Sequence, residues 1–262
     1  MNTRPPKVSW LLCSNVANDQ LRAAIDSCLQ QSFEDFELIV VANGKRAAEV
    51  ELVVGMWFPH ETRLRIFKTE IQHLTFSLSL GLHYARAELI ARMDSDDISY
   101  RHRLALQVKF MEINPAVVAL GTAYDLIDSL GGKLHTVTPP LSDLDIREEL
   151  PYRNPMCHPT VMLRRSAVTS VGGYLGSIHA EDYDLWVRLA ADCQNKFANL
   201  PDVCLGYRAI STGTARKARS AYAAMAATQV YAGLMGCSVK WFLGLFISMT
   251  KAMSRPRAPK AT

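Results

Sequence analysis

Short apolar runs alternate with helix-like segments over residues 1–100 of the chain. Runs of strand length lie at residues 8–13, 36–41, 64–67 and 89–93. Between them, apolar residues recur at helical spacing in three segments, at residues 19–31, 46–57 and 76–86. This alternation predicts an open, mostly parallel α/β sheet flanked by helices.

The pattern changes after Asp97. It predicts a helix at 101–112, a hairpin of strands 117–127 and 133–137, a short helix at 142–150, strands at 160–163 and 203–207, and a helix that opens at 180–182. From about Ala215 onward the chain is predicted to be helical. We therefore expect an α/β domain at 1–212, made of halves 1–100 and 101–212, and a C-terminal helical extension at 213–262.

Composition narrows the classes of function. Of the 262 residues 49% are hydrophobic, which is enough for a sizeable core, and the formal net charge is only +4. No run of Lys or Arg precedes the C-terminus, so nucleic-acid binding is not expected. The six cysteines form no C-x-x-C pair, and the first seven residues are polar, so we expect a cytoplasmic protein with reduced thiols.

The most informative stretch is the predicted strand that ends in Met93 and runs into Asp94, Asp96 and Asp97. Residues two apart in an extended segment point the same way, so Asp94 and Asp96 can reach one ion. Hard divalent cations take oxygen ligands, and the carboxyl edge of an open α/β sheet is where nucleotides bind. Taken alone, the pair fits a solvated turn or a helix N-cap equally well.

Several motifs together resemble family 2 glycosyltransferases with the GT-A fold, over residues 8 to 208. They are QSFEDFELIVV at 31–41, ARMDSDDIS at 91–99, HPTVM at 158–162, VGGY at 171–174 and AEDYDLW at 180–186. The resemblance implies transfer of a sugar from a nucleotide-diphosphate donor to an acceptor hydroxyl, with inversion at the anomeric carbon.

The resemblance also implies roles for particular residues. Asp94 lies near the ribose and metal, and Asp96 ligates Mg²⁺ or Mn²⁺ held by the diphosphate, whose developing charge needs neutralising. Asp182 is the base that activates the acceptor, with Glu181 beside it. Simple capping of the helix is the alternative interpretation of Glu181 and Asp182.

The remaining predicted site residues fall on two sides. On the donor side are Ser14, Asn43, Arg92 and His158, although His158 is also consistent with a hydrogen-bonded core residue. On the acceptor side are Trp186 and Asp184. Trp186 is expected to pack in the core first, with one edge facing the acceptor sugar.

The sequence departs from the family pattern in three places. Cys13-Ser14-Asn15-Val16 replaces Pro, a small residue, Tyr and Asn. Ala42-Asn43-Gly44 replaces an Asp-Asp-Gly or Asp-Asn-Gly motif, so recognition of the base would depend on Asn43 and backbone groups; a UDP-sugar is favoured as donor. Ala209-Ile210 follows Tyr207-Arg208 where a metal-ligating His often stands, so metal binding is weaker or is completed by water.

The last segment, at 239–253, is apolar with basic flanks. Its uncharged run of ten residues, 241–250, is too short to span a bilayer, which needs about 20. An aromatic helix with basic flanks can lie in an anionic membrane interface, and a packing or oligomer helix is the alternative. Because related enzymes often use lipid-linked acceptors, we expect peripheral association with the inner face of the plasma membrane.

The sequence thus predicts a metal-dependent inverting hexosyltransferase that acts on a glycan or lipid-linked acceptor in surface polysaccharide or lipopolysaccharide biosynthesis. Two alternatives are a non-catalytic nucleotide-sugar-binding relative and a nucleotidyltransferase. The second should carry a Gly-rich, basic phosphate loop after the first strand, and residues 14–20 contain neither Gly nor Lys.

Overall fold

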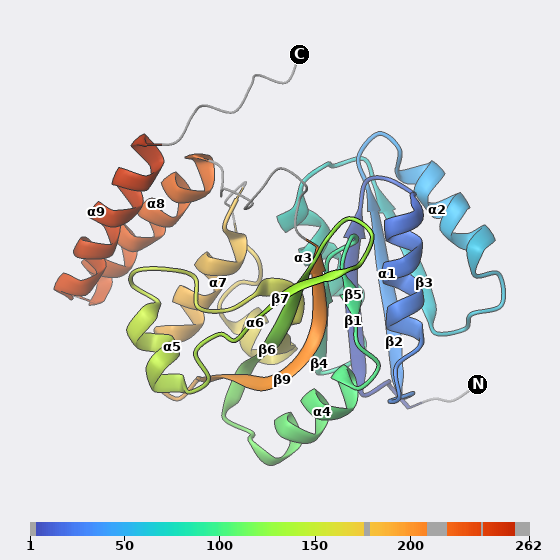
Figure 1. Cartoon of the computed structure of the whole chain (residues 1–262), viewed down its shortest axis with the longest axis horizontal. Coiled ribbons are helices and arrows are strands. Elements are labelled where there is room, and N and C mark those ends of the chain that lie inside the picture. The colour runs from blue at the N-terminus through green and yellow to red at the C-terminus, as the bar shows by residue number, and fades with distance from the viewer. Residues whose placement is uncertain (1–3, 176–178, 209–218, 237, 255–262) are drawn as a thin grey trace.

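A mixed nine-stranded sheet runs through the computed structural model, with helices on both faces (Figure 1). The structure describes residues 4–175, 179–208, 219–236 and 238–254. The strand order is β3-β2-β1-β4-β8-β6-β9-β5, and β7 pairs with β6. The predicted α/β class is therefore confirmed.

The first four strands in the chain are parallel to one another. They are β1 (Val8–Ser14), β2 (Phe36–Asn43), β3 (Leu64–Thr69) and β4 (Leu89–Met93). The connecting helices are α1 (Asp19–Leu29), α2 (Ala47–Trp57) and α3 (Leu74–Tyr84). Asn18 caps α1, because its side chain accepts a hydrogen bond from the Leu21 backbone N–H at 2.9 Å. These elements match the prediction to within one or two residues at most ends.

The remaining strands extend the sheet with mixed direction. They are β5 (Ile98–Ser99), β6 (Val117–Ile127), β7 (Lys133–Val137), β8 (Met162–Arg164) and β9 (Lys196–Arg208). β8 pairs antiparallel with both β4 and β6, whereas β6 and β9 are parallel. The helices of this part are α4 (Arg103–Ile113), α5 (Asp143–Glu149), α6 (Arg165–Ser170) and α7 (Glu181–Ala190).

Three local features differ from the sequence-based prediction. Thr160 belongs to a 3-10 helix, His158–Thr160, and the following strand begins only at Met162. β9 begins at Lys196 rather than at residue 203, because its first half contains Asn199 and Pro201, which mask the strand pattern. β5 and α6 were not predicted; each is too short to produce a periodic signal.

Two apolar clusters, one on each face of the sheet, form the core. One packs α1, α2 and α4 against the sheet, and the other packs α3, α6 and α7. Arg103 of α4 is fully buried, lies over the Trp10 ring at 5.2 Å, and donates to the Arg92 carbonyl at 2.8 Å. This hydrogen bond ties α4 to the end of β4, directly before the three acidic residues.

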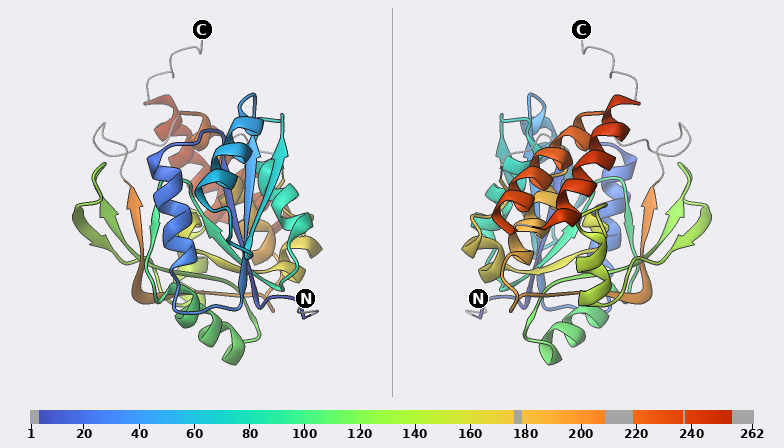
Figure 2. Two further views of the ribbon diagram at one scale, coloured as in Figure 1. Left: turned by 90° about the vertical axis from the view of Figure 1, so that its right-hand side faces the viewer. Right: turned by 90° about the vertical axis from the view of Figure 1, so that its left-hand side faces the viewer.

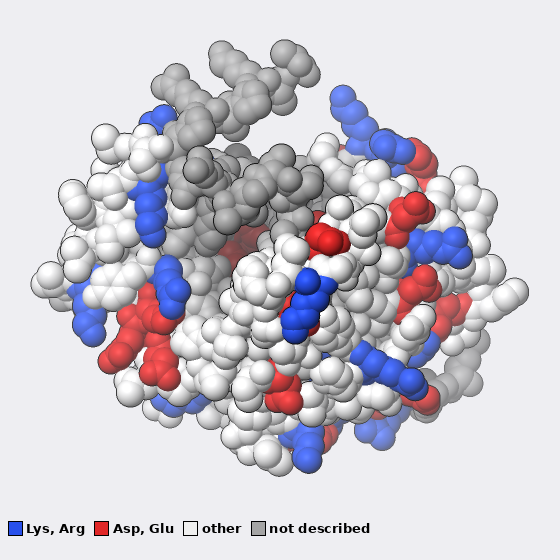
Figure 3. Space-filling model, viewed as in Figure 1, with Lys and Arg blue, Asp and Glu red and all other residues white. Residues whose placement is uncertain are grey.

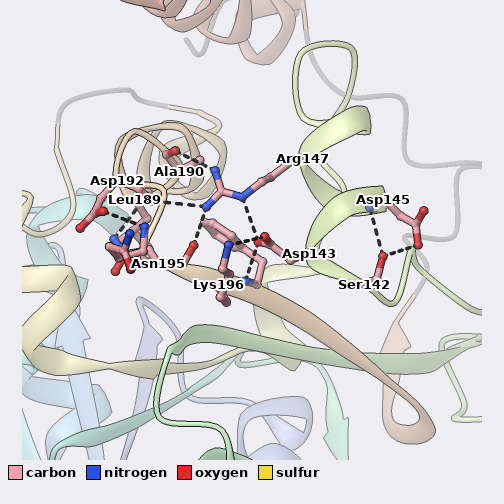
Figure 4. Close-up of polar contacts among 11 residues, drawn as sticks. Ser142, Asp143, Asp145, Arg147, Leu189, Ala190, Asp192, Asn195 and Lys196 are labelled. Carbon is pink, nitrogen blue, oxygen red and sulfur yellow. Dashed lines mark hydrogen bonds and ion pairs between the residues drawn. The ribbon is translucent and has the colours of Figure 1, made fainter.

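Helix α5 is fixed to the elements that follow it by one arginine (Figure 4). Arg147 pairs with Asp143 and donates to the carbonyls of Ala190 and Asn195, at 2.8 and 2.5 Å. Asp143 in turn accepts from the Phe197 backbone N–H at 3.1 Å. The end of α7 and the start of β9 therefore hold α5, and the segment that leaves α5, in one position.

The C-terminal part described by the structure is a pair of helices, α8 (Arg219–Gly236) and α9 (Val239–Met253), that lie side by side and pack beside α7 (Figure 2). Part of the predicted helix start, at 215–218, lies outside the described residues. Among the described helices none is long and apolar enough to cross a membrane. The division into domains at 100 and 212 stays a prediction.

Candidate active site

The carboxyl end of β4 carries three acidic side chains in unequal environments. Asp94 and Asp96 are partly exposed, whereas Asp97 is buried and its Oδ1 accepts from the Arg208 backbone N–H at 2.8 Å. Burial, reinforced by the charge of Asp94, raises the pKa of Asp96 and, more strongly, that of Asp97. This turn therefore carries negative charge that is only partly compensated.

Two arginines hold the acidic turn in place. Arg92, in β4 itself, is 2% exposed and forms an ion pair with Asp94, and its Nε has no hydrogen-bond partner among the described residues. Arg208, at the end of β9, donates from Nε to the Asp96 carbonyl at 2.7 Å and from Nη1 to the carbonyls of Asp128 and Ser129. Arg208 therefore shapes the turn by binding the backbone carbonyl of Asp96, which leaves the Asp96 carboxylate available.

The chemistry of the turn fits a divalent cation. Two carboxylates at i and i+2 can both contribute oxygen ligands, and their mutual repulsion favours a cation between them. In the described part of the chain, however, no three His, Cys, Asp or Glu side chains are grouped to hold a metal. An ion at this turn would complete its shell with donor phosphates and water. Ala209 and Ile210, where the family often has a ligand, lie outside the described residues.

The second acidic pair stands at the start of α7. The preceding residue, Ala180, has a left-handed backbone with φ of 66°, which costs a non-glycine residue about 1 kcal/mol. Asp182 is partly buried; its Oδ2 accepts from Asn154 Nδ2 at 2.6 Å, and its Oδ1 accepts from the Tyr183 backbone N–H at 2.8 Å. The strained residue and these hydrogen bonds fix the direction of the carboxylate.

The side chain of Glu181, which precedes Asp182 in the sequence, faces the buried His158. Its Oε1 lies 3.8 Å from Nδ1 of His158, whose Nε2 lies 2.9 Å from the Tyr174 hydroxyl. Burial and the charge of Arg92 lower the pKa of His158 well below its usual range, so the imidazole is neutral at neutral pH. Burial, together with the negative charge of Asp182, raises the pKa of Glu181 to about 7.

The two acidic parts of the site act on common neighbours. The charges of Asp94 and Asp182 both raise the pKa of Cys157, after the larger effect of burial, and both also raise that of Glu181. Glu181 also lies 3.8 Å from His158, whose pKa is lowered by burial and by the charge of Arg92. Arg92 is the ion-pair partner of Asp94, so the turn after β4 and the start of α7 adjoin one region. The structure thus brings together Arg92, Asp94, His158, Glu181 and Asp182 as the sequence predicted.

Other predicted site residues lie elsewhere or have local partners. Ser14 is buried at the end of β1, where its hydroxyl donates to the Val16 carbonyl at 2.8 Å, and Asn43 is 7% exposed at the end of β2. Asp184 pairs with Arg188 at 2.7 Å. Their predicted roles stay predictions.

The expectation that one edge of Trp186 faces the acceptor sugar is wrong. Its side chain has no exposed surface and packs edge-on against His158, with ring centroids 6.0 Å apart. In this structure no edge of Trp186 is available to an acceptor sugar. Its place at i+4 from Asp182 directs the indole into the core, and the core role is the one that the structure supports.

Three residues that contact this site had no predicted role. Asn154 and Arg208 act through hydrogen bonds to residues 28 and 112 positions away, respectively. Such pairings leave no periodic signal in one sequence. Tyr174 belongs to the VGGY motif, which was noticed for its turn and not for its hydroxyl.

An open sheet that carries an Asp-x-Asp turn at the end of β4 and a Glu-Asp pair at a nearby helix start defines a glycosyltransferase with a GT-A-like fold. Residues 11–172 match the family model described as Glycosyl transferase family 2. The chain belongs to this family. The predicted glycosyltransferase is thereby confirmed, and the nucleotidyltransferase alternative is set aside.

Relatives and solved structures agree with this membership. The chain is 34% identical, over 76% of its length and 78% of the relative, to the O-antigen biosynthesis glycosyltransferase WbnJ of Escherichia coli. It is 26% identical, over 83% and 79% of the two chains, to the UDP-Gal:alpha-D-GlcNAc-diphosphoundecaprenol beta-1,3-galactosyltransferase of Escherichia coli.

Two solved structures share the fold. One is the mannosyltransferase PcManGT of Pyrobaculum calidifontis in complex with GDP-Man and Mn²⁺, with a TM-score of 0.69, 15% identity, and coverage of 96% of this chain and 74% of that one. The other is TarS of S. aureus, with a TM-score of 0.64 and 17% identity; it covers 86% of this chain, which spans 39% of the TarS chain.

The burial of Glu181 predicts a pH-dependent stability with a definite sign. A carboxyl whose folded pKa is raised stabilises the fold below its unfolded pKa, and this contribution is lost as the pH rises through about 7. We expect Glu181→Gln to be more stable than the wild type at pH 8, by about 2 kcal/mol, with the difference vanishing near pH 4. Urea unfolding at both pH values measures this difference.

Glu61→Gln provides a control with the opposite sign. Its hydrogen bond with Arg63 lowers the pKa of Glu61, so that substitution should cost stability at pH 8 and little at low pH. A stability difference between Glu181→Gln and the wild type that is the same at both pH values would contradict the assignment of Glu181 as a buried, mostly protonated acid.

Proposed function

We propose that this glycosyltransferase is a metal-dependent, inverting hexosyltransferase in which one acidic site binds the donor and the other activates the acceptor. The observation that carries the proposal is the presence of two carboxylate groups on separate elements that adjoin one region, Asp94 and Asp96 after β4 and Asp182 at the start of α7. Their charges act on the same buried neighbours, Cys157 and Glu181. Inverting transfer needs this division, because the leaving group and the attacking hydroxyl lie on opposite faces of the sugar.

On the donor side, Asp96 and Asp94 would hold Mg²⁺ or Mn²⁺ against the diphosphate of the nucleotide sugar. A bound ion would neutralise the charge that develops on the leaving diphosphate. Arg92, buried beneath the turn, pairs with Asp94 and orients its carboxylate. Arg208 keeps the turn in a fixed shape through the Asp96 carbonyl. Manganese in the GDP-Man complex of PcManGT, which shares the fold, supports this choice.

The donor nucleotide would lie along the carboxyl ends of β1 and β2, where Ser14 and Asn43 stand. Ala42, at the position where the family often has an acidic residue, is fully buried and has no polar group. Asn43 and backbone groups would therefore read the base. We propose a UDP-sugar, and the UDP-Gal-dependent relative supports this proposal.

On the acceptor side, Asp182 would remove the proton from the attacking hydroxyl. Its two oxygens accept hydrogen bonds from the Asn154 side chain and from the Tyr183 backbone N–H. Both donors are uncharged, and they orient the carboxylate. Glu181 faces His158, and its pKa of about 7 leaves it only partly ionised at neutral pH, so it would sit beside the base without acting as the base itself.

The acceptor is proposed to be a glycan, or a glycan linked to a lipid, in the assembly of surface polysaccharide. The names of two relatives, an O-antigen biosynthesis enzyme and a galactosyltransferase that acts on a diphosphoundecaprenol acceptor, support this class. Such an acceptor lies at the inner face of the plasma membrane, so the enzyme would work at that surface.

The α8–α9 hairpin offers an apolar surface that suits such a location. Its large exposed side chains are Val230, Tyr231, Leu234, Met235, Val239, Phe242, Leu243, Phe246, Met249 and Met253. Residues 219–254 contain three basic and no acidic residues, and charged residues elsewhere on the surface are of both signs (Figure 3). We propose that the hairpin lies in the interface of an anionic membrane. Trp241, predicted to share this face, packs largely against the core instead.

Substitution of Asp96 and of Asp182 should separate donor binding from acceptor activation. Asp96→Asn removes a metal ligand and should weaken donor binding and stop both transfer and slow donor hydrolysis. Asp182→Asn keeps the shape of the side chain but not its basicity, so it should bind the donor normally and lose transfer by roughly 10²–10⁴-fold. Nucleotide release from UDP-galactose, UDP-N-acetylglucosamine and GDP-mannose, with acceptor and Mn²⁺, measures both steps.

A purely structural Asp182 predicts a different result. Because Asn is as good an N-cap as Asp, Asp182→Asn would then cost little stability and little activity. Near-normal turnover by Asp182→Asn at saturating donor would remove Asp182 as the base.

Membrane association is tested by flotation with vesicles. The wild-type chain should float with vesicles that contain anionic phosphatidylglycerol and less with pure phosphatidylcholine, since basic residues near an anionic surface each contribute about 1 kcal/mol. Phe246→Glu, on the exposed face of α9, should abolish flotation. Ile113→Glu is the matched control, because Ile113 is 72% exposed at the end of α4.

Equal flotation of Phe246→Glu and of the wild type, or no flotation of either, would show that the hairpin is a packing element. The glycosyltransferase assignment would not be affected, because no residue of the hairpin belongs to the proposed donor or acceptor site.

A further inference from the structure

Besides its apolar contacts with α7 and the core, the α8–α9 hairpin encloses one backbone carbonyl of the rest of the molecule. Gln229 of α8 is fully buried and donates from Nε2 to the Pro151 carbonyl at 2.9 Å. Gly244 of α9 lies against the same carbonyl, and any Cβ at position 244 would overlap it. The two helices thus enclose the Pro151 carbonyl, one by a hydrogen bond and the other by the absence of a side chain.

The segment that contains Pro151 also holds the proposed base. Three residues further on, Asn154 donates from Nδ2 to Asp182 Oδ2 at 2.6 Å, while its own Oδ1 accepts from the Met156 backbone N–H at 3.2 Å. On the other side of Pro151, the Leu150 carbonyl accepts from the buried Tyr183 hydroxyl at 2.7 Å. The segment is therefore fixed at both ends to the first turn of α7.

The start of this segment is rigid for an independent reason. Helix α5, which leads into it, is anchored through Arg147 to the carbonyls at the end of α7 and the start of β9 (Figure 4). We therefore expect a displacement of the Pro151 carbonyl to be taken up between Pro151 and Asn154 more than in α5.

We propose that Asn154 is a positioning residue for Asp182, and that the α8–α9 hairpin keeps Asn154 in place by enclosing the Pro151 carbonyl. The proposal rests on the proposed function, in which Asp182 is the base. A hydrogen bond to a carboxylate is short and directional, so an amide at 2.6 Å fixes the orientation of the Asp182 carboxylate. The hairpin then connects the membrane-facing surface with the chemistry of acceptor activation.

Titration of the Asn154 side-chain amide tests the hydrogen bond without any substrate. In the full chain labelled with ¹⁵N-asparagine, the Asn154 amide resonance should shift with pH as Asp182 takes up a proton, and the shift should vanish in Asp182→Asn. The groups whose pKa responds to the charge of Asp182 include Glu181 on its own helix and Tyr174 and Cys157 on other segments, and His158 and Asp94 lie in the same region. Glu181→Gln separates the contribution of the nearest one.

The role of the hairpin is tested on the same resonance. Gly244→Ala should move the Asn154 amide signal and reduce its titration, although alanine would favour an isolated helix. Gly236→Ala is the matched control, because a Cβ at position 236 meets no atom within 4 Å, and it should leave the signal unchanged. A signal in Gly244→Ala that coincides with that of Gly236→Ala would overturn the hairpin's part in the proposal.

Two substitutions at Asn154 distinguish positioning from a structural role. Asn154→Asp keeps an acceptor for the Met156 N–H but replaces the donor with a negative charge, whereas Asn154→Ala removes both. The pH profile of turnover is measured with the nucleotide sugar that the nucleotide-release assay identifies as donor. Its acid limb should move to higher pH by about one unit in Asn154→Ala, and further in Asn154→Asp. Rates should approach the wild type at high pH.

A structural role predicts the reverse order, with Asn154→Asp close to the wild type and Asn154→Ala slower at every pH. That result, or an amide that titrates identically in Asp182→Asn, would overturn the proposal. Failure of the proposed function has a separate signature. In that case Asp182→Asn turns over normally, whatever the Asn154 amide shows.

Discussion

Negative charge concentrated at the carboxyl end of β4 is the constraint on which the site depends. Three carboxylates follow a buried strand, and each lies in a different environment: Asp94 beside the buried Arg92, Asp96 partly open, and Asp97 buried against the backbone of β9. A buried guanidinium is costly unless it is paired, so Arg92 and Asp94 stabilise each other. Repulsion within the turn remains, and it favours a cation there, through which a diphosphate would be held.

The rest of the sheet holds this turn in place. β8 and β6 separate β4 from β9, and the end of β9 returns Arg208 to the turn. Burial reduces the charge of two side chains in this region. It leaves His158 neutral and raises the pKa of Glu181 to about 7. In the proposed mechanism Asp182, held by Asn154 and the Tyr183 backbone, is the group that takes the proton from the acceptor.

Much of this arrangement was predictable from the sequence, for physical reasons. Buried strands and amphipathic helices have strong periodicity, so the parallel half was predicted nearly residue by residue. Asp94, Asp96 and Asp182 stand in contiguous motifs at element ends. Asn154 and Arg208 act through contacts between distant segments and leave no local pattern. Trp186 was expected in the core first, and it lies there with no exposed surface, so the edge expected to face the acceptor is buried as well.

Calorimetry of UDP and GDP binding to the full chain, in Mn²⁺ and in EDTA, tests the central claim most directly. If the turn of Asp94 and Asp96 requires a cation in order to accept a diphosphate, one of the two nucleotides should bind at least about tenfold more weakly in EDTA, a loss of about 1.4 kcal/mol. Asp96→Asn should bind as weakly in Mn²⁺ as the wild type does in EDTA. Equal affinity in both conditions would contradict the account.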